Sequence, residues 1–161
     1  MGVQMTPNKL TYYLDSNRVK YITLTHSPAY TSQEIAALAH IPGKSLAKTV
    51  LVKADGKLIM VVLPASYKIN FDLLKKALGA KEVRLAYEQE FKDKFPDCEV
   101  GAMPPFGNLY NMEVYVSRSL TDDFEIAFNA CCHNNLIKMG FRDFQRLVEP
   151  KVIEFTYPSK L

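Results

Sequence analysis

The sequence predicts one mixed α/β domain with a largely antiparallel sheet, and three observations support this prediction. The chain has 161 residues, a length that suits a single compact core. Its composition, 48% apolar and 23% charged, is that of an ordinary globular protein. Short strand-like segments alternate with helical patterns and hairpin turns. The sequence has no internal repeat and no interdomain linker, so residues 1–161 are expected to form one domain.

The first part of the chain predicts two short helices around a strand. Residues 1–7 are expected to be a loose lead-in. Asn8 has the residue type that begins a helix, here over Lys9–Ser16, and a β-prone strand follows at Tyr21–Thr25. The segment Thr31–Glu34 has the S/T-x-x-E form of a capping box, which predicts the start of a second helix.

The central stretch, Gly43–Ala65, is typical of a β-hairpin. Its turn is Asp55-Gly56, a dipeptide that tolerates the positive φ angles of a two-residue turn. Both flanking segments are rich in Val, Leu and Ile on both faces, so the two strands are expected in the middle of the sheet. The alternation of a strand divides the side chains of the first segment into two faces, Leu46, Lys48, Val50 and Val52 on one and Ala47, Thr49, Leu51 and Lys53 on the other.

The second half of the chain predicts a further series of short elements. Asn70 and Gly79 are residue types that begin and end a helix, with apolar residues at helical spacing between them. The expected elements after it are a strand at Glu82–Leu85, a helix at Tyr87–Phe95, strands at Glu113–Ser117, Glu125–Ala130 and Asn135–Met139, a helix at Phe141–Val148 and a strand at Val152–Phe155. A Gly/Pro loop, Gly101–Gly107, precedes the later strands.

Charge and cysteine usage narrow the classes of function. The net charge of +3 permits contact with a polyanion but does not by itself predict one. The three cysteines lack CxxC spacing, so they predict neither a disulfide framework nor a zinc site. They are expected as small, partly buried thiols of a soluble, cytoplasmic protein. Residues 1–20 lack the apolar stretch of a signal peptide, and the longest apolar run, Leu58–Ala65, is too short to span a bilayer.

Lys48 is the first candidate site residue. It shares its predicted strand face with three aliphatic residues, and a lysine is almost never fully buried without a partner. It therefore needs either an anion or an exit to water. In the second case the side chain would extend past Leu46 to solvent and have a structural role only.

The Gly101–Gly107 loop is the second candidate. Pro104 and Pro105 remove the amide donors that a phosphate-binding loop needs, and the chain has no nucleotide-binding, metalloprotease or serine-hydrolase motif. A Pro-Pro segment is stiff, and it can present fixed backbone carbonyls to the amino group of a ligand. The alternative is a rigid loop without a ligand.

Two histidines follow predicted strands. His26 precedes Ser-Pro at the end of an apolar strand, a position typical of the rim of a site and also of an ordinary loop histidine. His133 follows Cys131 and Cys132 at the end of another strand, where a histidine taken alone more often has a structural role. No spacing of metal ligands and no Cys-His pair is recognisable, so any reaction is expected to need neither a metal nor a thiol.

The order of these features resembles the YbaK family, the free-standing relatives of the editing domain inserted in bacterial prolyl-tRNA synthetases. The resemblance extends from Val19 to Phe155 and rests on four segments: Thr25-His26-Ser27-Pro28, Ala47-Lys48-Thr49, Gly101-x-x-Pro104-Pro105-Phe106-Gly107 and Glu125–His133. It implies a curved, barrel-like mixed sheet flanked by helices. One departure concerns specificity, because the family pattern has Gly-Thr-His-Thr where this chain has Cys131-Cys132-His133-Asn134.

The resemblance also implies an activity, hydrolysis of the ester that joins a wrong amino acid to the 3′ end of tRNA. It implies no cofactor and no metal; the partner would be mischarged tRNA, together with an aminoacyl-tRNA synthetase in some settings. The implied catalytic residues are Lys48, Gly101 and His133, and the implied substrate-binding residues are His26, Thr49, Met103, Pro104, Pro105, Phe106 and Gly107. Two alternatives remain open: a non-catalytic module that binds tRNA ends or a synthetase, and a hydrolase of another small aminoacyl ester.

Overall fold

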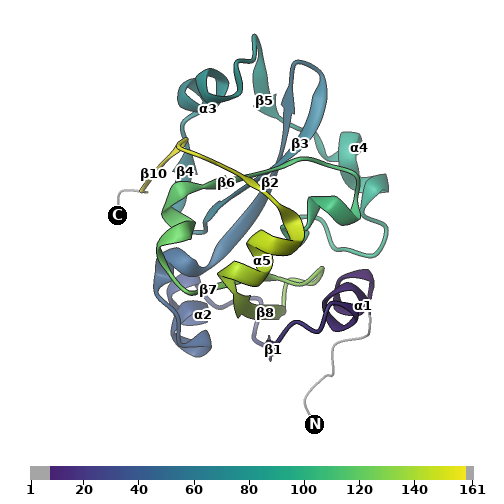
Figure 1. Cartoon of the computed structure of the whole chain (residues 1–161), viewed down its shortest axis with the longest axis vertical. Coiled ribbons are helices and arrows are strands. Elements are labelled where there is room, and N and C mark those ends of the chain that lie inside the picture. Colours follow the sequence, from purple (N-terminus) through teal and green to yellow (C-terminus); the bar gives the residue numbers. More distant parts are fainter. Residues whose placement is uncertain (1–7, 159–161) are drawn as a thin grey trace.

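The computed structural model describes residues 8–158, so the predicted lead-in at residues 1–7 lies outside the described part (Figure 1). The helices are α1 (Lys9–Ser16), α2 (Ser32–Ala39), α3 (Phe71–Leu78), α4 (Glu88–Phe91) and α5 (Phe141–Val148), with short 3-10 segments at Gly43–Ser45, Lys92–Lys94, Gly107–Leu109 and Arg118–Asp122. The strands are β1 (Tyr21–Thr25), β2 (Ala47–Ala54), β3 (Lys57–Pro64), β4 (Tyr67–Ile69), β5 (Val83–Leu85), β6 (Val114–Ser117), β7 (Glu125–Asn129), β8 (Asn135–Gly140), β9 (Lys151–Ile153) and β10 (Thr156–Pro158). The predicted mixed α/β class is confirmed.

The central hairpin lies where the sequence predicts it. Asp55 and Gly56 form the turn with φ angles of 50° and 81°, so both residues occupy the left-handed region that such a turn requires. The largest sheet has the order β5-β2-β3-β6-β9, which places both hairpin strands in its interior. Most pairs in the protein are antiparallel, while β3–β6 and β6–β9 are parallel.

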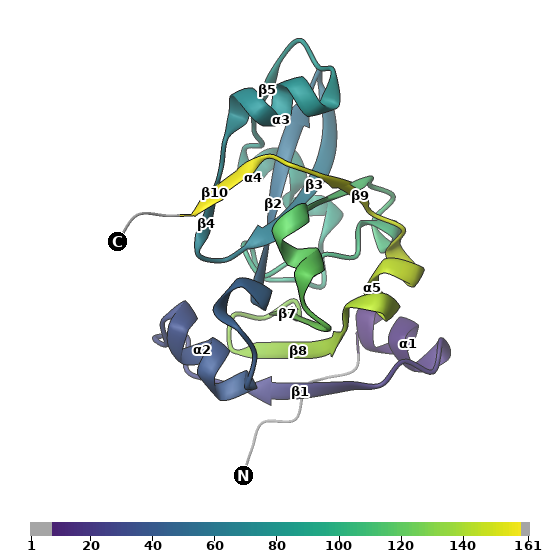
Figure 2. The same ribbon diagram turned by 60° about the vertical axis from the view of Figure 1, so that its left-hand side comes forward.

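A second sheet, β1-β8-β7, forms a layer across one end of the hairpin, as Figure 2 shows. A single parallel bridge between Leu46 and Ala127 links the start of β2 to β7. The short strands β4 and β10 form a separate pair. Within residues 8–158 the strands do not close into a barrel; the resemblance predicted a barrel-like sheet, and the structure has three sheets at an angle to one another.

The two faces of the hairpin pack in different hydrophobic clusters. Ala47, Leu51 and Met60 belong to the larger cluster, which α1, α5 and the Gly101–Gly107 loop complete. Val52, Ile59, Val61 and Leu63 belong to a smaller cluster with Leu74 of α3 and Phe155. The predicted division of β2 into two faces is therefore confirmed, and both faces are apolar because both are covered.

Several predicted boundaries differ from the structure. The helix expected at Tyr87–Phe95 is α4 followed by a 3-10 turn, and the strand expected at Val152–Phe155 is β9, which ends at Ile153. The sequence did not predict β4 and β10, because each has three residues and pairs with a segment far away in the chain. Among residues 8–158, no helix combines the length and hydropathy needed to cross a membrane.

Candidate functional site

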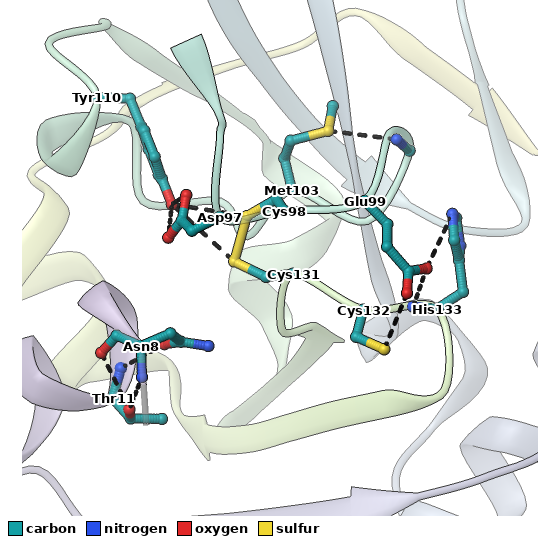
Figure 3. The surroundings of a disulfide bond; sticks show 11 residues. Asn8, Thr11, Asp97, Cys98, Glu99, Met103, Tyr110, Cys131, Cys132 and His133 are labelled. Carbon is teal, nitrogen blue, oxygen red and sulfur yellow. Dashed lines mark hydrogen bonds and ion pairs between the residues drawn. A yellow bond between two sulfur atoms is a disulfide. The ribbon is translucent and has the colours of Figure 1, made fainter. Parts of the chain in front are cut away.

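The Gly101–Gly107 loop and the turn between β7 and β8 are joined by backbone hydrogen bonds. The Glu99 N–H donates to the Cys131 carbonyl at 2.8 Å, and the Cys131 N–H donates to the Ala102 carbonyl at 2.9 Å. These two bonds hold the segment Glu99–Ala102 against Cys131, just beyond the end of β7. We call this junction of residues 98–103 with residues 130–134 the seam. Figure 3 shows some of its side chains, those of Cys98, Glu99, Met103, Cys131, Cys132 and His133.

Gly101 and His133 meet at the exposed end of the seam. Gly101 has a φ of +87°, and a Cβ placed on it would lie 3.2 Å from Cε1 of His133. His133 Nε2 lies 2.7 Å from the Val100 carbonyl, and since a carbonyl only accepts, Nε2 carries the proton. In the neutral ring Nδ1 is then an acceptor, and no partner for it is found within residues 8–158. The structure thus brings together two of the three predicted catalytic residues.

Glu99 orders the turn that carries His133. Its carboxylate accepts hydrogen bonds from the Cys132 thiol at 3.2 Å and from the backbone N–H of His133 at 3.2 Å (Figure 3). The Cys132 thiol, and then the His133 amide, hold the pKa of Glu99 below its usual range. Glu99 is not predictable from the sequence, because nothing distinguishes it there from the other acidic residues.

The predicted substrate-binding side chains of the loop are buried. Phe106 packs against Phe128 and Phe144 with ring centroids 5.6 Å away in both cases. A Cβ on Gly107 would lie 2.5 Å from Val114 Cγ2, so only glycine fits there. Met103, Pro104 and Pro105 are likewise buried. These side chains anchor the loop in the core, and the exposed residues are Gly101, where the loop begins, and Glu99 and Val100 just before it.

Lys48 is half-buried on the face of β2 that carries Val50 and Val52. Met103 and Phe106 pack in the cluster of the opposite face, which also carries Thr49, so the Lys48 side chain does not point toward the buried part of the loop. Within the described chain, the Lys48 ammonium has neither a hydrogen bond nor an ion pair. Desolvation, and then the nearby charge of Lys68, lower the pKa of Lys48.

The start of β2 nevertheless lies beside the seam. Leu46 is bridged to Ala127, and two residues further along each strand, on the same faces, stand Lys48 and Asn129. Beyond Asn129 the chain bonds to Glu99–Ala102 instead of to β2. Lys48 is therefore located at the end of β2 that lies nearest to β7 and the seam.

His26 contacts the same turn from β1. The backbone N–H of His26 donates to the Asn134 carbonyl at 2.9 Å, and the His26 ring stacks on the Tyr30 ring with the ring centroids 6.3 Å apart. Nδ1 lies 2.9 Å from the Ser27 carbonyl and so carries the proton. Nε2 is a buried acceptor without a partner among residues 8–158, on a side chain that is only 6% exposed. A buried acceptor of this kind costs free energy unless a ligand or a water donates to it.

Comparison with known proteins decides the family. The family model described as "Aminoacyl-tRNA editing domain" matches residues 26–147. The chain belongs to the aminoacyl-tRNA editing domain family. The matched region begins at His26 and includes Lys48, the loop and His133.

Relatives of this editing domain include whole synthetases. A proline–tRNA ligase of Bacillus mycoides strain KBAB4 is 26% identical over 120 residues, which are 74% of this chain and 21% of that enzyme. A proline–tRNA ligase of Bacillus cytotoxicus is 26% identical over 135 residues, 83% of this chain and 23% of that enzyme. The chain thus spans less than a quarter of the length of these ligases.

Two solved structures share the fold of the editing domain. One is described as the hypothetical protein APE2540, with a TM-score of 0.79, 23% identity and coverage of 93% of this chain and 100% of that chain. The other is described as a putative trans-editing enzyme for prolyl tRNA synthetase, with a TM-score of 0.79, 14% identity and coverage of 92% and 94%. The predicted resemblance is confirmed.

The expectation of three free thiols is wrong for two of them. Cys98 and Cys131 form a disulfide with their Cα atoms 4.1 Å apart, and Cys132 is free. The two cysteines are 33 residues apart and are brought together by the seam, so their spacing in the sequence does not predict the disulfide. Only with the disulfide reduced would the two sulfurs be potential metal ligands; an Asp97 oxygen lies within 4.8 Å of both, and this grouping has no signal in the sequence either.

Proposed function

We propose that this editing domain is a trans-editing deacylase, which hydrolyses the ester between a wrong amino acid and the 3′ end of tRNA. The membership of the family supports the reaction class. The observation that carries the proposal is the contact of Gly101 with His133 at the exposed end of the seam, with an acceptor nitrogen of His133 left available. The substrate is mischarged tRNA, free or delivered by an aminoacyl-tRNA synthetase.

The chemistry requires few groups. An aminoacyl ester is already activated, so the enzyme contributes positioning and electrostatic stabilisation more than a strong base. His133 Nδ1 accepts a hydrogen bond from the attacking water or from the substrate, while the Val100 carbonyl fixes the ring. The exposed backbone at Gly101 receives the α-amino group of the amino acid. The 2′-OH of the terminal nucleotide assists the water.

Lys48 supplies the positive charge of the proposed site. An ammonium that is half-buried and has no anionic partner within residues 8–158 is a suitable binding group for a phosphate of the tRNA end. Such a contact is worth about 1.5–3 kcal/mol. The partly buried position is consistent with an anion that arrives with the substrate, and it makes the purely structural role of Lys48 the weaker interpretation.

The remaining predicted substrate-binding residues have supporting roles in the proposal. His26 offers its unpaired Nε2 to a donor on the substrate or to a bound water. Met103, Pro104, Pro105, Phe106 and Gly107 hold the loop backbone in position from the core, and Thr49 lies on the loop side of β2. Cys131 and Cys132 precede His133 in place of the Gly-Thr of the family pattern, so the preferred amino acid is to be found by experiment.

A panel of mischarged tRNAs tests the proposal. Each is labelled on the amino acid, and loss of label is compared with the spontaneous rate for the native protein and for Lys48→Ala. Lys57→Ala is the matched control, because Lys57 is an exposed lysine of the same hairpin that pairs with Glu113. We expect acceleration for at least one aminoacyl group, reduced by Lys48→Ala only. Binding of tRNA without acceleration for any member of the panel would favour the non-catalytic module.

A further inference from the structure

We propose that the Cys98–Cys131 disulfide is a redox-sensitive cross-link that sets the activity of the seam. Its oxidised form holds the loop and the His133 turn together, and its reduction loosens both. The activity part of this inference rests on the proposed function, whereas the structural part does not.

The location of the cross-link supports this inference. Cys98 lies three residues before Gly101, and Cys131 lies two residues before His133. The disulfide is therefore a covalent bond between the two segments whose contact forms the candidate site (Figure 3). It lies at the entry to the loop, before the residues that are anchored in the core.

The other contacts across the seam are hydrogen bonds, several of them exposed. The backbone pairs of Cys131 with Glu99 and Ala102 remain after reduction, as does the bond from His133 to Val100. The Glu99 carboxylate is at the surface, where water competes for its partners. Once the covalent bond is broken, residues 98–101 are joined to the His133 turn by these exchangeable contacts, so local opening of the seam becomes more frequent.

One sulfur is accessible to a reductant. Cys131 is buried at 5% exposure, whereas Cys98 is partly exposed, so an incoming thiolate reaches Cys98 Sγ. The attack forms a mixed disulfide at Cys98 and releases Cys131 as a thiol after it takes up a proton. A second small thiol then attacks the mixed disulfide, leaves Cys98 as a thiol and departs as the small-molecule disulfide. Two small thiols are oxidised and one protein disulfide is reduced.

The negative charge of Asp97 beside the disulfide is expected to affect the rate of this thiol–disulfide exchange. Asp97 and the Tyr110 hydroxyl surround the two sulfurs, with the hydroxyl 3.6 Å from Cys98 Sγ and 3.2 Å from an Asp97 oxygen. The exposed carboxylate repels an anionic thiol such as glutathione. Asp97→Asn is therefore expected to accelerate reduction by glutathione several-fold, with a smaller effect on reduction by an uncharged thiol.

The experiment compares oxidised and reduced protein in buffers of stepped thiol-to-disulfide ratio. Free thiols are counted, deacylation is measured, and amide exchange is followed at Glu99 and Cys131, with Val61 in β3 as an internal control. We expect one thiol in the oxidised protein and three in the reduced one. On reduction we expect exchange at the seam to rise roughly tenfold and deacylation to fall roughly tenfold, since misplacement by an ångström can cost about a hundredfold.

Two variants distinguish the effect of losing the disulfide from the effect of losing the free Cys132 thiol. The double variant Cys98→Ser/Cys131→Ser should behave like the reduced protein in every buffer, whereas Cys132→Ser should still respond to the redox ratio. Equal exchange at the seam in both redox states would overturn the inference, and so would three free thiols with a stoichiometric zinc ion in oxidising buffer. If no aminoacyl-tRNA is hydrolysed, the proposed function fails while the exchange measurement still decides on the cross-link.

Discussion

Gly101→Ala isolates the contact on which the proposed function depends, and the chain supplies a matched control. Gly101 has a φ of +87° and Gly56 has a φ of +81°, so an alanine is strained to a similar degree at both positions. Around Gly56 nothing lies within 4 Å of the added Cβ, whereas at Gly101 it would lie 3.2 Å from His133 Cε1. The two variants therefore share the backbone strain and differ in the displacement of His133.

The magnitudes follow from these distances. A left-handed conformation costs a residue with a Cβ about 1–2 kcal/mol, so both variants should melt about 2–8 °C below the native protein. At Gly101 the His133 ring must also move, which weakens its 2.7 Å bond to the Val100 carbonyl. Because misplacement of a positioning group by an ångström can cost about a hundredfold, we expect Gly101→Ala to lower deacylation roughly ten- to a hundredfold.

Thermal unfolding and deacylation of both variants form the assay. Gly56→Ala is expected to lose stability and keep near-native turnover, measured well below its melting temperature. Native turnover in a folded Gly101→Ala protein would refute the role of the Gly101–His133 contact. An equal loss of turnover in both variants would show that strain, and not the site, determines the rate.

Three further predictions concern charge and metal. Lys48→Ala should slow deacylation roughly ten- to a hundredfold. Burial lowers the pKa of Lys48 in the folded state, so the charged ammonium opposes folding. Lys48→Met should therefore raise the melting temperature at pH 7, and this gain should shrink as the pH rises through the lowered pKa of Lys48. The pKa of Glu99 is lowered in the folded protein, so the stability that its carboxylate gives the seam is present above the ordinary pKa of 4.5 and is lost as the pH falls through the lowered pKa. Amide exchange at His133, relative to its intrinsic rate, should increase in that low pH range, and Glu99→Gln should abolish this pH dependence. EDTA should leave deacylation intact; loss of activity that zinc restores would contradict this and assign function to Asp97, Cys98 and Cys131.

Local signals in the sequence predicted the parts of the fold that depend on neighbouring residues. The capping box of α2 forms as expected, with the Thr31 N–H donating to the Glu34 carboxylate at 3.0 Å and the Glu34 N–H donating to the Thr31 hydroxyl at 3.1 Å. The turn at Asp55 and Gly56 is likewise fixed by the two residues that form it. Such elements need no knowledge of the rest of the chain.

The parts that the sequence did not predict depend on segments far apart in the chain. The disulfide, the role of Glu99 and the pairing of β4 with β10 arise only when the seam and the sheets are assembled. The burial of Met103 and Phe106 belongs to the same class, because a Gly/Pro loop carries no periodicity that says which side chains face the core. The resemblance placed the loop and His133 in one site, but it gave no information on the cross-link between them.

The arrangement of β1 has a consequence for folding during synthesis on the ribosome. Its partner strand is β8, and the paired residues Thr25 and Asn135 are 110 positions apart. At translation rates of about 5–20 residues per second, β1 waits roughly 6–22 s before the segment that covers it exists. During that time the strand has unpaired backbone groups that other nascent chains can bind. Early-acting chaperones that bind extended segments are therefore expected to recognise residues 21–25 before the candidate site can form.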